Sequence, residues 1–539
     1  MVPAGRDTGN RCGRHAVVEG MPNTHPRRDA LRFGAFAGVA LLAPALPASA
    51  AEASTSHFRH GVASGDPLPE RVVLWTRVTP TEDSTPGSGV GPTVVVGYEV
   101  AKDAQFRQVV RRGEVTTGPD RDHTVKPDVG GLRPGCWYFY RFTFDGVHSP
   151  VGRTRTAPAH HSDADQLRFG VVSCSSWVAG HFAAYRHLAE RGDLDAVVHL
   201  GDYLYEDYIG TQFRTHEPPG EAVSLTDYRR RHAQYKTDPD LQHLHATYPW
   251  IITWDDHEWA ENAWSDGSPD HDETTEGTWT NRRAAAMRAY REWMPVRLDG
   301  DRVYRRLRFG TLAELTMLDL RSYRSRQVDQ DQVDEPGRTL TGPDQMAFLR
   351  DGLLHTDVQW KLIGNPVIFS PLLIPPVPQA GAVAQLVGPT TNTDQWDGYP
   401  HDRAAVIRLL DEHDVRDTVF LTGDVHSSWA FEVPVDEALY PLTKTVATEL
   451  VVPSVTSDNI DELTGSPPRT TSLAIEAALV GLNRHLRWVE LDSHGYTVLD
   501  VRREHVRMNW YFLADRTRPD SPAALAKTVT VRSGTQRIG

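Results

Sequence analysis

Four short apolar stretches of this chain each lead directly into a side chain that can bind a metal ion. These side chains are Cys174, Asp202, Asp256 and Asp424. Short apolar runs are typical of buried strands, and the chemistry of an α/β sheet gathers in the loops at the carboxyl ends of its strands. We therefore predict that the four strand ends, although far apart in the chain, build one site.

One group of residues has the donor types that a transition metal prefers. Cys174, Tyr205 and His426 would offer a thiolate, a phenolate and an imidazole. A phenolate requires a strongly acidic metal because the pKa of free tyrosine is about 10, so the set favours Fe(III). Two alternatives remain open: Cys174 is an inert core thiol, or Tyr205 is a half-buried aromatic residue.

A second group offers hard oxygen donors. Asp256, Asn262 and Asp424 suit Ca²⁺, Mg²⁺ or Mn²⁺. Asp202 has two carboxylate oxygens and is expected to bridge the two ions. Such a pair of ions clamps a phosphate and activates water for attack. His257, next to Asp256, is the predicted catalytic residue, which protonates a leaving oxygen or stabilises the equatorial ones.

The composition of the chain excludes several classes of protein. Its 539 residues are enough for roughly two or three domains, and its ordinary apolar content excludes wholesale disorder. The net charge of −14 argues against a nucleic-acid groove, which needs patches of Lys and Arg. Three cysteines are too few for a disulfide framework, and Cys136 is expected to be a buried core thiol.

The first 50 residues have the pattern of a signal peptide. Arg27 and Arg28 precede an apolar run from Phe33 to Leu46, and small residues follow it. The paired arginines favour the twin-arginine export route, with a Sec signal as the alternative and Met21 as a second candidate start. We found no other run long enough for a membrane helix, so we expect a soluble, secreted protein. We also expect it to be a monomer.

The remainder divides into an all-β domain, a catalytic domain and a tail. Turn-separated β-branched and aromatic runs predict a small sandwich over residues 51–157. The catalytic domain is expected over residues 158–515, followed by a loosely ordered polar tail at 516–539. Within the catalytic domain, residues 229–232 are interpreted as a mostly solvated basic face, and the Pro-rich loop 371–388 as a candidate lid.

At these positions the chain resembles the alkaline phosphatase D (PhoD-type) family of the metallophosphoesterase superfamily. The motifs that carry the resemblance lie at residues 61–67, 173–174, 201–206, 254–258, 396–400 and 423–429. The resemblance implies a fibronectin-like sandwich before a four-layer αββα metallophosphoesterase domain, with iron and calcium at the site. The chain is also similar to the iron-containing phospholipase D of the same fold and to purple acid phosphatases, which have an aspartate where Cys174 stands.

Three functions are compatible with these residues. The leading hypothesis is a secreted metal-dependent phosphoesterase that hydrolyses phosphate monoesters and diesters. The alternative is a phospholipase D that releases head groups from phospholipids, and the spacing of the ligands cannot separate the two because both would use the same metal site. A non-catalytic, metal-stabilised binding module is disfavoured because no ligand position is broken.

Overall fold

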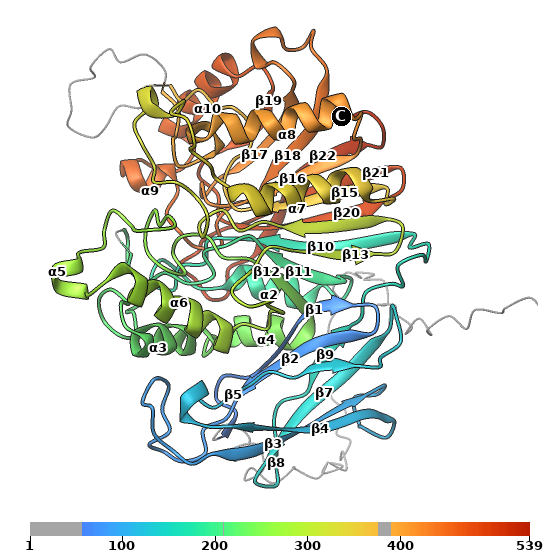
Figure 1. Cartoon of the computed structure of the whole chain (residues 1–539), viewed down its shortest axis with the longest axis vertical. Helices are drawn as coiled ribbons and strands as arrows, with labels where there is room; N and C mark the ends of the chain where they lie inside the picture. The colour runs from blue at the N-terminus through green and yellow to red at the C-terminus, as the bar shows by residue number, and fades with distance from the viewer. Residues whose placement is uncertain (1–56, 209, 376–389) are drawn as a thin grey trace, which may run out of the picture.

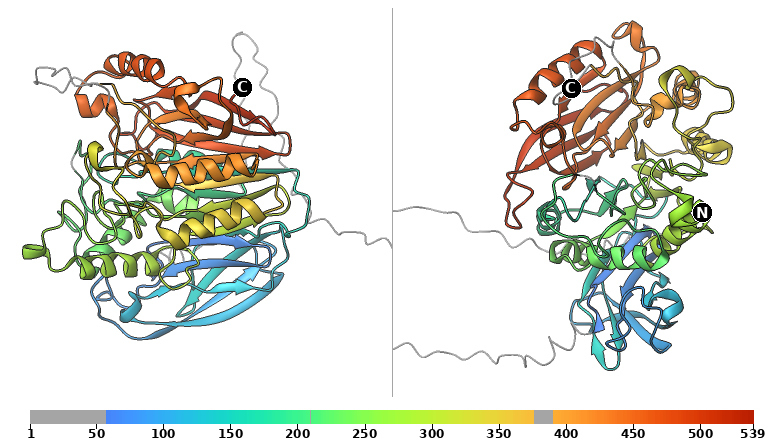
Figure 2. Two further views of the ribbon diagram at one scale, coloured as in Figure 1. Left: turned by 45° about the horizontal axis from the view of Figure 1, so that its top comes forward. Right: turned by 90° about the vertical axis from the view of Figure 1, so that its left-hand side faces the viewer.

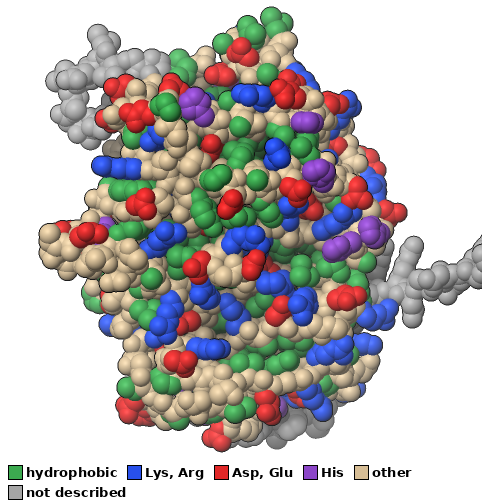
Figure 3. Space-filling view, viewed as in Figure 1, with side chains coloured by type: hydrophobic (Ala, Val, Ile, Leu, Met, Phe, Trp, Pro, Cys, Tyr) green, Lys and Arg blue, Asp and Glu red, His purple; other side chains and the backbone are tan. Residues whose placement is uncertain are grey.

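The structure, a computed structural model, describes residues 57–208, 210–375 and 390–539. The predicted leader, and the predicted lid beyond residue 375, lie outside the described residues. Within the described ranges, no helix is both long enough and apolar enough to cross a membrane. Side chains of both charges are interspersed over the face of the molecule seen in Figure 3.

The first sheet has ten strands, and three parallel strands at its centre lead to the predicted site. Its strands run in the order β22 (Ala523–Arg532), β21 (His505–Leu513), β20 (Gly495–Arg502), β10 (Gln166–Val172), β11 (Ala196–His199), β12 (Pro249–Ile252), β1 (Val62–Leu68), β2 (Arg71–Arg77) and β5 (Thr124–Val125), with β6 (Asp128–Gly130) also paired to β2. Strands β10, β11 and β12 are mutually parallel, so their carboxyl ends lie at one edge.

A second sheet of seven strands contributes the remaining predicted ligands. Its order is β13 (Arg305–Phe309), β14 (Ala313–Met317), β15 (Trp360–Asn365), β16 (Thr418–Thr422), β18 (Thr445–Val451), β17 (Ser428–Pro434) and β19 (Leu486–Glu490). Strands β14, β15, β16 and β18 are parallel. Asp424 and His426 follow β16 directly.

The two sheets pack face to face and helices cover their outer faces (Figures 1 and 2). Phe169 and Val198 of the first sheet share one apolar core with Leu315 and Val419 of the second. The α-helices among the described residues are α2 (Ala183–Glu190), α3 (Leu225–Tyr235), α4 (Pro239–Thr247), α5 (Glu273–Glu276), α6 (Trp279–Trp293), α7 (Gly342–His355), α8 (Pro400–Glu412), α9 (Ile460–Thr464) and α10 (Thr471–Leu482). Helices α2, α4 and α6 pack on the first sheet and α7 and α8 on the second, which gives the predicted αββα layers.

The N-terminal strands are less separate from the catalytic domain than the sequence analysis predicted. A five-stranded sheet contains β4 (Val109–Thr117), β3 (Val94–Ala101), β7 (Trp137–Phe144), β8 (Val147–His148) and β9 (Gly152–Arg155). It packs on β2 through a core that includes Leu74, Val96 and Phe142. However, β1 pairs in parallel with β12, so the opposing layer is an extension of the catalytic sheet.

The chain end is also more ordered than predicted. Strand β22 pairs with β21 over nearly its whole length at the edge of the first sheet. The prediction of a loosely ordered tail overlooked the alternation around Val529 and Val531, which are buried while their neighbours Thr528 and Thr530 are not. Alternation with a period of two is the signature of a half-buried strand.

Lys236 is a buried lysine at the seam between the N-terminal strands and the catalytic domain. Its Nζ donates to Tyr203 Oη at 2.9 Å and lies 4.7 Å from the ring centroid of Trp75 in β2. Burial lowers the pKa of Lys236 to about 7. His245, whose pKa burial also lowers, lies 3.4 Å from the same Nζ.

The titration of Lys236 should make stability rise with pH. Between about pH 7 and about pH 10 the unfolded chain keeps the lysine proton that the folded chain has released, which adds a slope of up to about 1.4 kcal/mol per pH unit to the free energy of unfolding. Urea titrations across this range should give a smaller slope for Lys236→Met than for the wild type. The exposed Lys444→Met is the control, and equal slopes in all three proteins would contradict this account.

Candidate metal centre

The loops after β10, β11, β12 and β16 carry the predicted ligands in unusual backbone conformations. Left-handed φ angles occur at Cys174 (57°), Asp202 (56°), Asn262 (51°), Asp424 (65°) and His426 (51°). Residues other than glycine seldom adopt this region, and such strain clusters at functional sites because the surrounding structure enforces it. The backbone therefore sets the direction of each side chain.

The soft donors and Asp202 come together after β10, β11 and β16. Asp202 Oδ2 lies 3.4 Å from Cys174 Sγ and 3.3 Å from Tyr205 Oη. Tyr205 Oη lies 3.1 Å from His426 Nε2. The ligand atoms of Cys174, Asp202 and His426 all lie within 4.8 Å of one another, close enough for one ion.

Carboxylates form two further groups beside the first. Asp202, Asp256 and His257 have ligand atoms within 4.8 Å of one another, as do Asp255, Asp256 and Asp424. Asp202 and Asp256 each belong to two of the three groups, so adjacent ions could share them. Asp255 was not predicted, although it immediately precedes a predicted ligand.

The donor set fits a pair of cations. Asp202 is 2% exposed and its Oδ1 has no hydrogen-bond partner among the described residues. Burial, and after it neighbouring acids such as Asp255 and Asp256, hold the pKa values of Asp202 and Asp424 well above their usual range. Buried carboxylates without compensating charge are costly, and bound cations would supply that charge.

Asn262 lies at the same cavity as these carboxylates, but its described hydrogen bonds do not single it out as a ligand. Its backbone N–H donates to Asp256 Oδ2 at 2.7 Å, and its Nδ2 donates to Glu261 Oε1 at 2.7 Å. Asn262 therefore orients Asp256 through its backbone.

Neighbouring groups orient the donor atoms. His426 Nδ1 lies 2.9 Å from the carbonyl oxygen of Asp458, which directs Nε2 toward Tyr205. Ser457 Oγ donates to Tyr205 Oη at 2.6 Å, and Gln395 Nε2 donates to Asp424 Oδ2 at 2.7 Å. Partners of this kind fix the orientation of metal ligands.

His257 is clamped between two carboxylates at the mouth of the site. Its Nδ1 lies 2.8 Å from Glu206 Oε2, its Nε2 lies 3.2 Å from Glu261 Oε2, and its ring centroid lies 4.0 Å from that of Tyr205. Burial lowers the pKa of His257, but Glu206 and then Asp256, among other acids, outweigh burial and raise it well above its usual value. The two carboxylates thus fix the orientation of the ring at the site.

Arg231 corrects one sequence-based interpretation. Residues 229–232 were expected to form a mostly solvated face, yet the Arg231 side chain is fully buried. Its guanidinium donates to the carbonyl oxygens of Tyr205, Glu206, Pro218 and Gly220. Such carbonyl acceptors are not visible in sequence, and they let a cation be buried beneath the loop that carries Tyr205.

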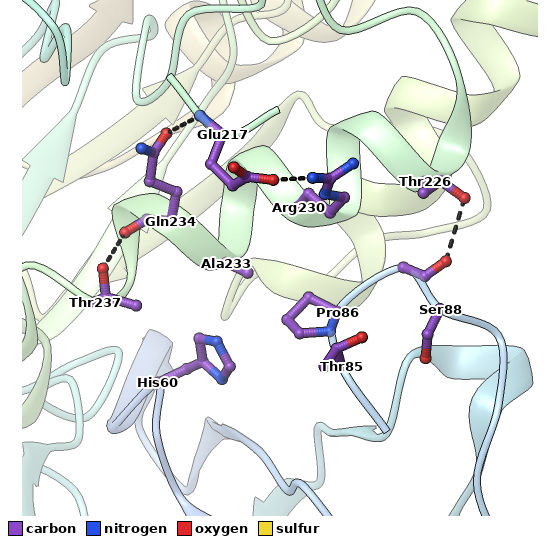
Figure 4. A pocket seen from close by; sticks show the side chains of 11 residues that line it. His60, Thr85, Pro86, Ser88, Glu217, Thr226, Arg230, Ala233, Gln234 and Thr237 are labelled. Atoms are coloured by element: carbon purple, nitrogen blue, oxygen red, sulfur yellow. Dashed lines mark hydrogen bonds and ion pairs between the residues drawn. The ribbon is translucent and has the colours of Figure 1, made fainter. Parts of the chain in front are cut away.

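Two adjoining cavities open onto the candidate centre. One of about 470 Å³ is lined by residues that include Asp202, Asp256, Asp424 and His426, and a second of about 590 Å³ adjoins it at His257. A third cavity of about 630 Å³ lies elsewhere, between His60 and Arg230 (Figure 4), and its lining includes none of the predicted ligands. We therefore assign the predicted metal chemistry to the two cavities at the candidate centre.

Glu258 joins two of the ligand loops. Its carboxylate accepts backbone N–H groups of Asp202 at 3.1 Å, Tyr203 at 2.6 Å and Asp255 at 2.8 Å. Burial raises the pKa of Glu258 to about 8, a shift that the backbone donors of Tyr203 and Asp255 oppose. One side chain thus fixes the backbone after both β11 and β12.

Glu258→Gln should loosen both loops because an NH₂ group replaces an acceptor oxygen and faces backbone N–H donors. We expect a loss of about 2 kcal/mol in the free energy of unfolding and a lower content of bound metal, measured by urea titration and elemental analysis. Glu314→Gln, at a half-buried glutamate of β14, is the control. Losses no greater than those of the control would show that Glu258 is dispensable.

Comparisons with known proteins show the family to which the chain belongs. Residues 169–510 match the PhoD-like phosphatase family and residues 43–158 match its N-terminal domain. Alkaline phosphatase D of Bacillus subtilis (strain 168) is 39% identical over 403 residues, which cover 71% of this chain and 67% of that protein. A solved structure of PhoD aligns with a TM-score of 0.80 and 33% identity, covering 92% of this chain and 93% of the other. The chain therefore belongs to the PhoD-like phosphatase family and is a phosphoric ester hydrolase.

Proposed function

We propose that this phosphoesterase hydrolyses phosphate monoesters and diesters at two bound cations, Fe(III) and Ca²⁺, after export through the twin-arginine route. The observation that carries the proposal is the overlap of three potential ligand groups at Asp202 and Asp256, beside one cavity of about 470 Å³. The export route rests on the paired Arg27 and Arg28 before an apolar run.

The two cations would share Asp202 and would otherwise be held by different donors. The residues proposed for Fe(III) are Cys174, Tyr205, His426 and Asp202. The residues proposed for Ca²⁺ are Asp256, Asn262, Asp424 and Asp202. When bound, the cations would supply positive charge to the phosphate oxygens and lower the pKa of the attacking water.

His257 is the proposed catalytic residue. Its ring lies against Tyr205 and is held at both nitrogens by Glu206 and Glu261. A histidine fixed in this way at the cavity is suited to give a proton to the leaving oxygen. The Glu206 carboxylate would stabilise the protonated ring before it gives up this proton.

Phospholipase D activity is the alternative proposal. Leu463 lines both cavities and is 66% exposed, and Leu473 and Val480 of α10 are 48% and 43% exposed. An exposed leucine at the cavities suits contact with an acyl chain, and α10, which contacts α9, carries the other two exposed apolar side chains. The metal chemistry would be the same, and the lipid would be selected outside the centre.

Iron content and substrate range test the proposal together. The purified wild type should absorb visible light through its iron-bound tyrosinate and should hydrolyse both p-nitrophenyl phosphate and bis-p-nitrophenyl phosphate. Cys174→Ala should lose both iron and turnover, whereas Cys136→Ala, at a buried thiol of the N-terminal domain, should keep them. An active protein without metal would contradict the scheme, and turnover of phosphatidylcholine far above that of the nitrophenyl esters would favour phospholipase D.

His257→Ala should keep the iron absorption but lose rate by about 10²- to 10⁴-fold. The loss should be larger for diphenyl phosphate than for bis-p-nitrophenyl phosphate, because p-nitrophenolate needs little protonation to depart. The exposed His355→Ala serves as the control. Equal losses for the two esters, or no loss, would remove His257 from proton transfer.

A further inference from the structure

We infer that Arg321 is a positioning residue for the oxygen-rich cation site formed by Asp256 and Asp424. The inference rests on the two-cation site proposed above and concerns a side chain that does not line the cavity. Arg321 follows β14, and its side chain is fully buried. Arg321 was not among the residues predicted for the site.

The guanidinium of Arg321 forms bidentate ion pairs with two carboxylates. Its Nε and Nη2 donate to Asp255 Oδ1 and Oδ2 at 2.7 and 2.9 Å. Its Nη1 and Nη2 donate to Asp394 Oδ1 and Oδ2, both at 3.0 Å. Only the planar fork of arginine can make two bidentate contacts of this kind.

Asp255 and Asp394, the two carboxylates that Arg321 binds, are each followed in the chain by a residue at the cation site. Asp256 follows Asp255 and is itself a proposed ligand. Gln395 follows Asp394 and donates to Asp424 Oδ2 at 2.7 Å. Arg321 therefore ties the loop after β12 to the segment around Asp394, and through them it sets the separation of the two ligands.

Charge gives the same residue a second role. Arg321 Nη2 lies 3.7 Å from Asp256 Oδ2 and 3.6 Å from Asp424 Oδ1, beyond an ideal hydrogen bond but within range of strong attraction. Arginine stays protonated in proteins. Its guanidinium therefore offsets part of the negative charge of the four carboxylates around it. Because both oxygens of Asp255 bind Arg321, Asp255 serves as an anchor instead of a ligand.

The soft-donor site is supported by other contacts. Ser457 donates to Tyr205, and His426 is oriented by the carbonyl oxygen of Asp458. Loss of the Arg321 fork should therefore weaken one cation site and spare the other. The iron site thus provides an internal control for folding.

Arg321→Lys tests the inference because lysine keeps the charge but cannot hold Asp255 and Asp394 together. Binding of Ca²⁺ alone to the iron-loaded protein, measured by titration calorimetry, should weaken by about 10- to 100-fold. The visible absorption of the iron site should stay unchanged, and kcat at saturating Ca²⁺ should largely recover. Arg229→Lys is the matched control, since Arg229 is also buried and forms a bidentate ion pair with Glu292, which is not among the proposed ligands or their partners; its Ca²⁺ affinity should stay within about twofold of the wild type.

Two outcomes would overturn the inference: unchanged Ca²⁺ affinity in Arg321→Lys, or parallel loss of iron and Ca²⁺. If Arg321→Lys does not fold, Asp255→Asn tests the same fork with less disruption and should also weaken Ca²⁺ binding while sparing iron. The calorimetric readout does not depend on turnover. If the wild type bound both cations but hydrolysed no phosphate ester, the proposed function would be wrong. The role of Arg321 in Ca²⁺ binding could still be tested by the same calorimetric titration.

Discussion

The buried carboxylate of Asp202 sets the condition that the rest of the centre must satisfy. One of its oxygens contacts Cys174 and Tyr205, and the other has no hydrogen-bond partner among the described residues. Removing such a group from water is costly unless opposite charge accompanies it. Burial of this uncompensated carboxylate thus reduces folding stability. The same burial would give the site its affinity for cations.

The two-sheet architecture makes this concentration of charge possible. Parallel strands in each sheet end at the same edge, and the shared core between the sheets keeps those edges in register. Buried polar side chains then hold the loops: Glu258 fixes the backbone after β11 and β12, and Arg231 supports the loop with Tyr205. The ligand residues can keep their left-handed backbone conformations because these contacts hold the loops in place.

Much of the fold and of the centre could be predicted because the signals are local. Each strand-end residue immediately follows an apolar run, so Cys174, Asp202 and Asp424 could be found without knowledge of any partner. Arg231 and Arg321 could not be recognised, because their acceptors lie on other loops and a buried cation has the same sequence signature as a solvated one. The strand near Val529 was missed because a polar edge strand resembles a tail, and the pairing of β1 with β12 is a long-range contact with no local pattern.

The N-terminal strands and the catalytic domain share one sheet, so the two cannot be separated without exposing a strand edge. Strand β1 covers one edge of β12, and Asp66 of β1 forms a bidentate ion pair with Arg305 of β13 in the other sheet. A fragment that began after the N-terminal strands would expose a row of unpaired amide and carbonyl groups beside the ligand loop, and such bare edges promote aggregation. The N-terminal segment is therefore a structural part of the catalytic sheet, and evolution could not exchange it as freely as an appended module.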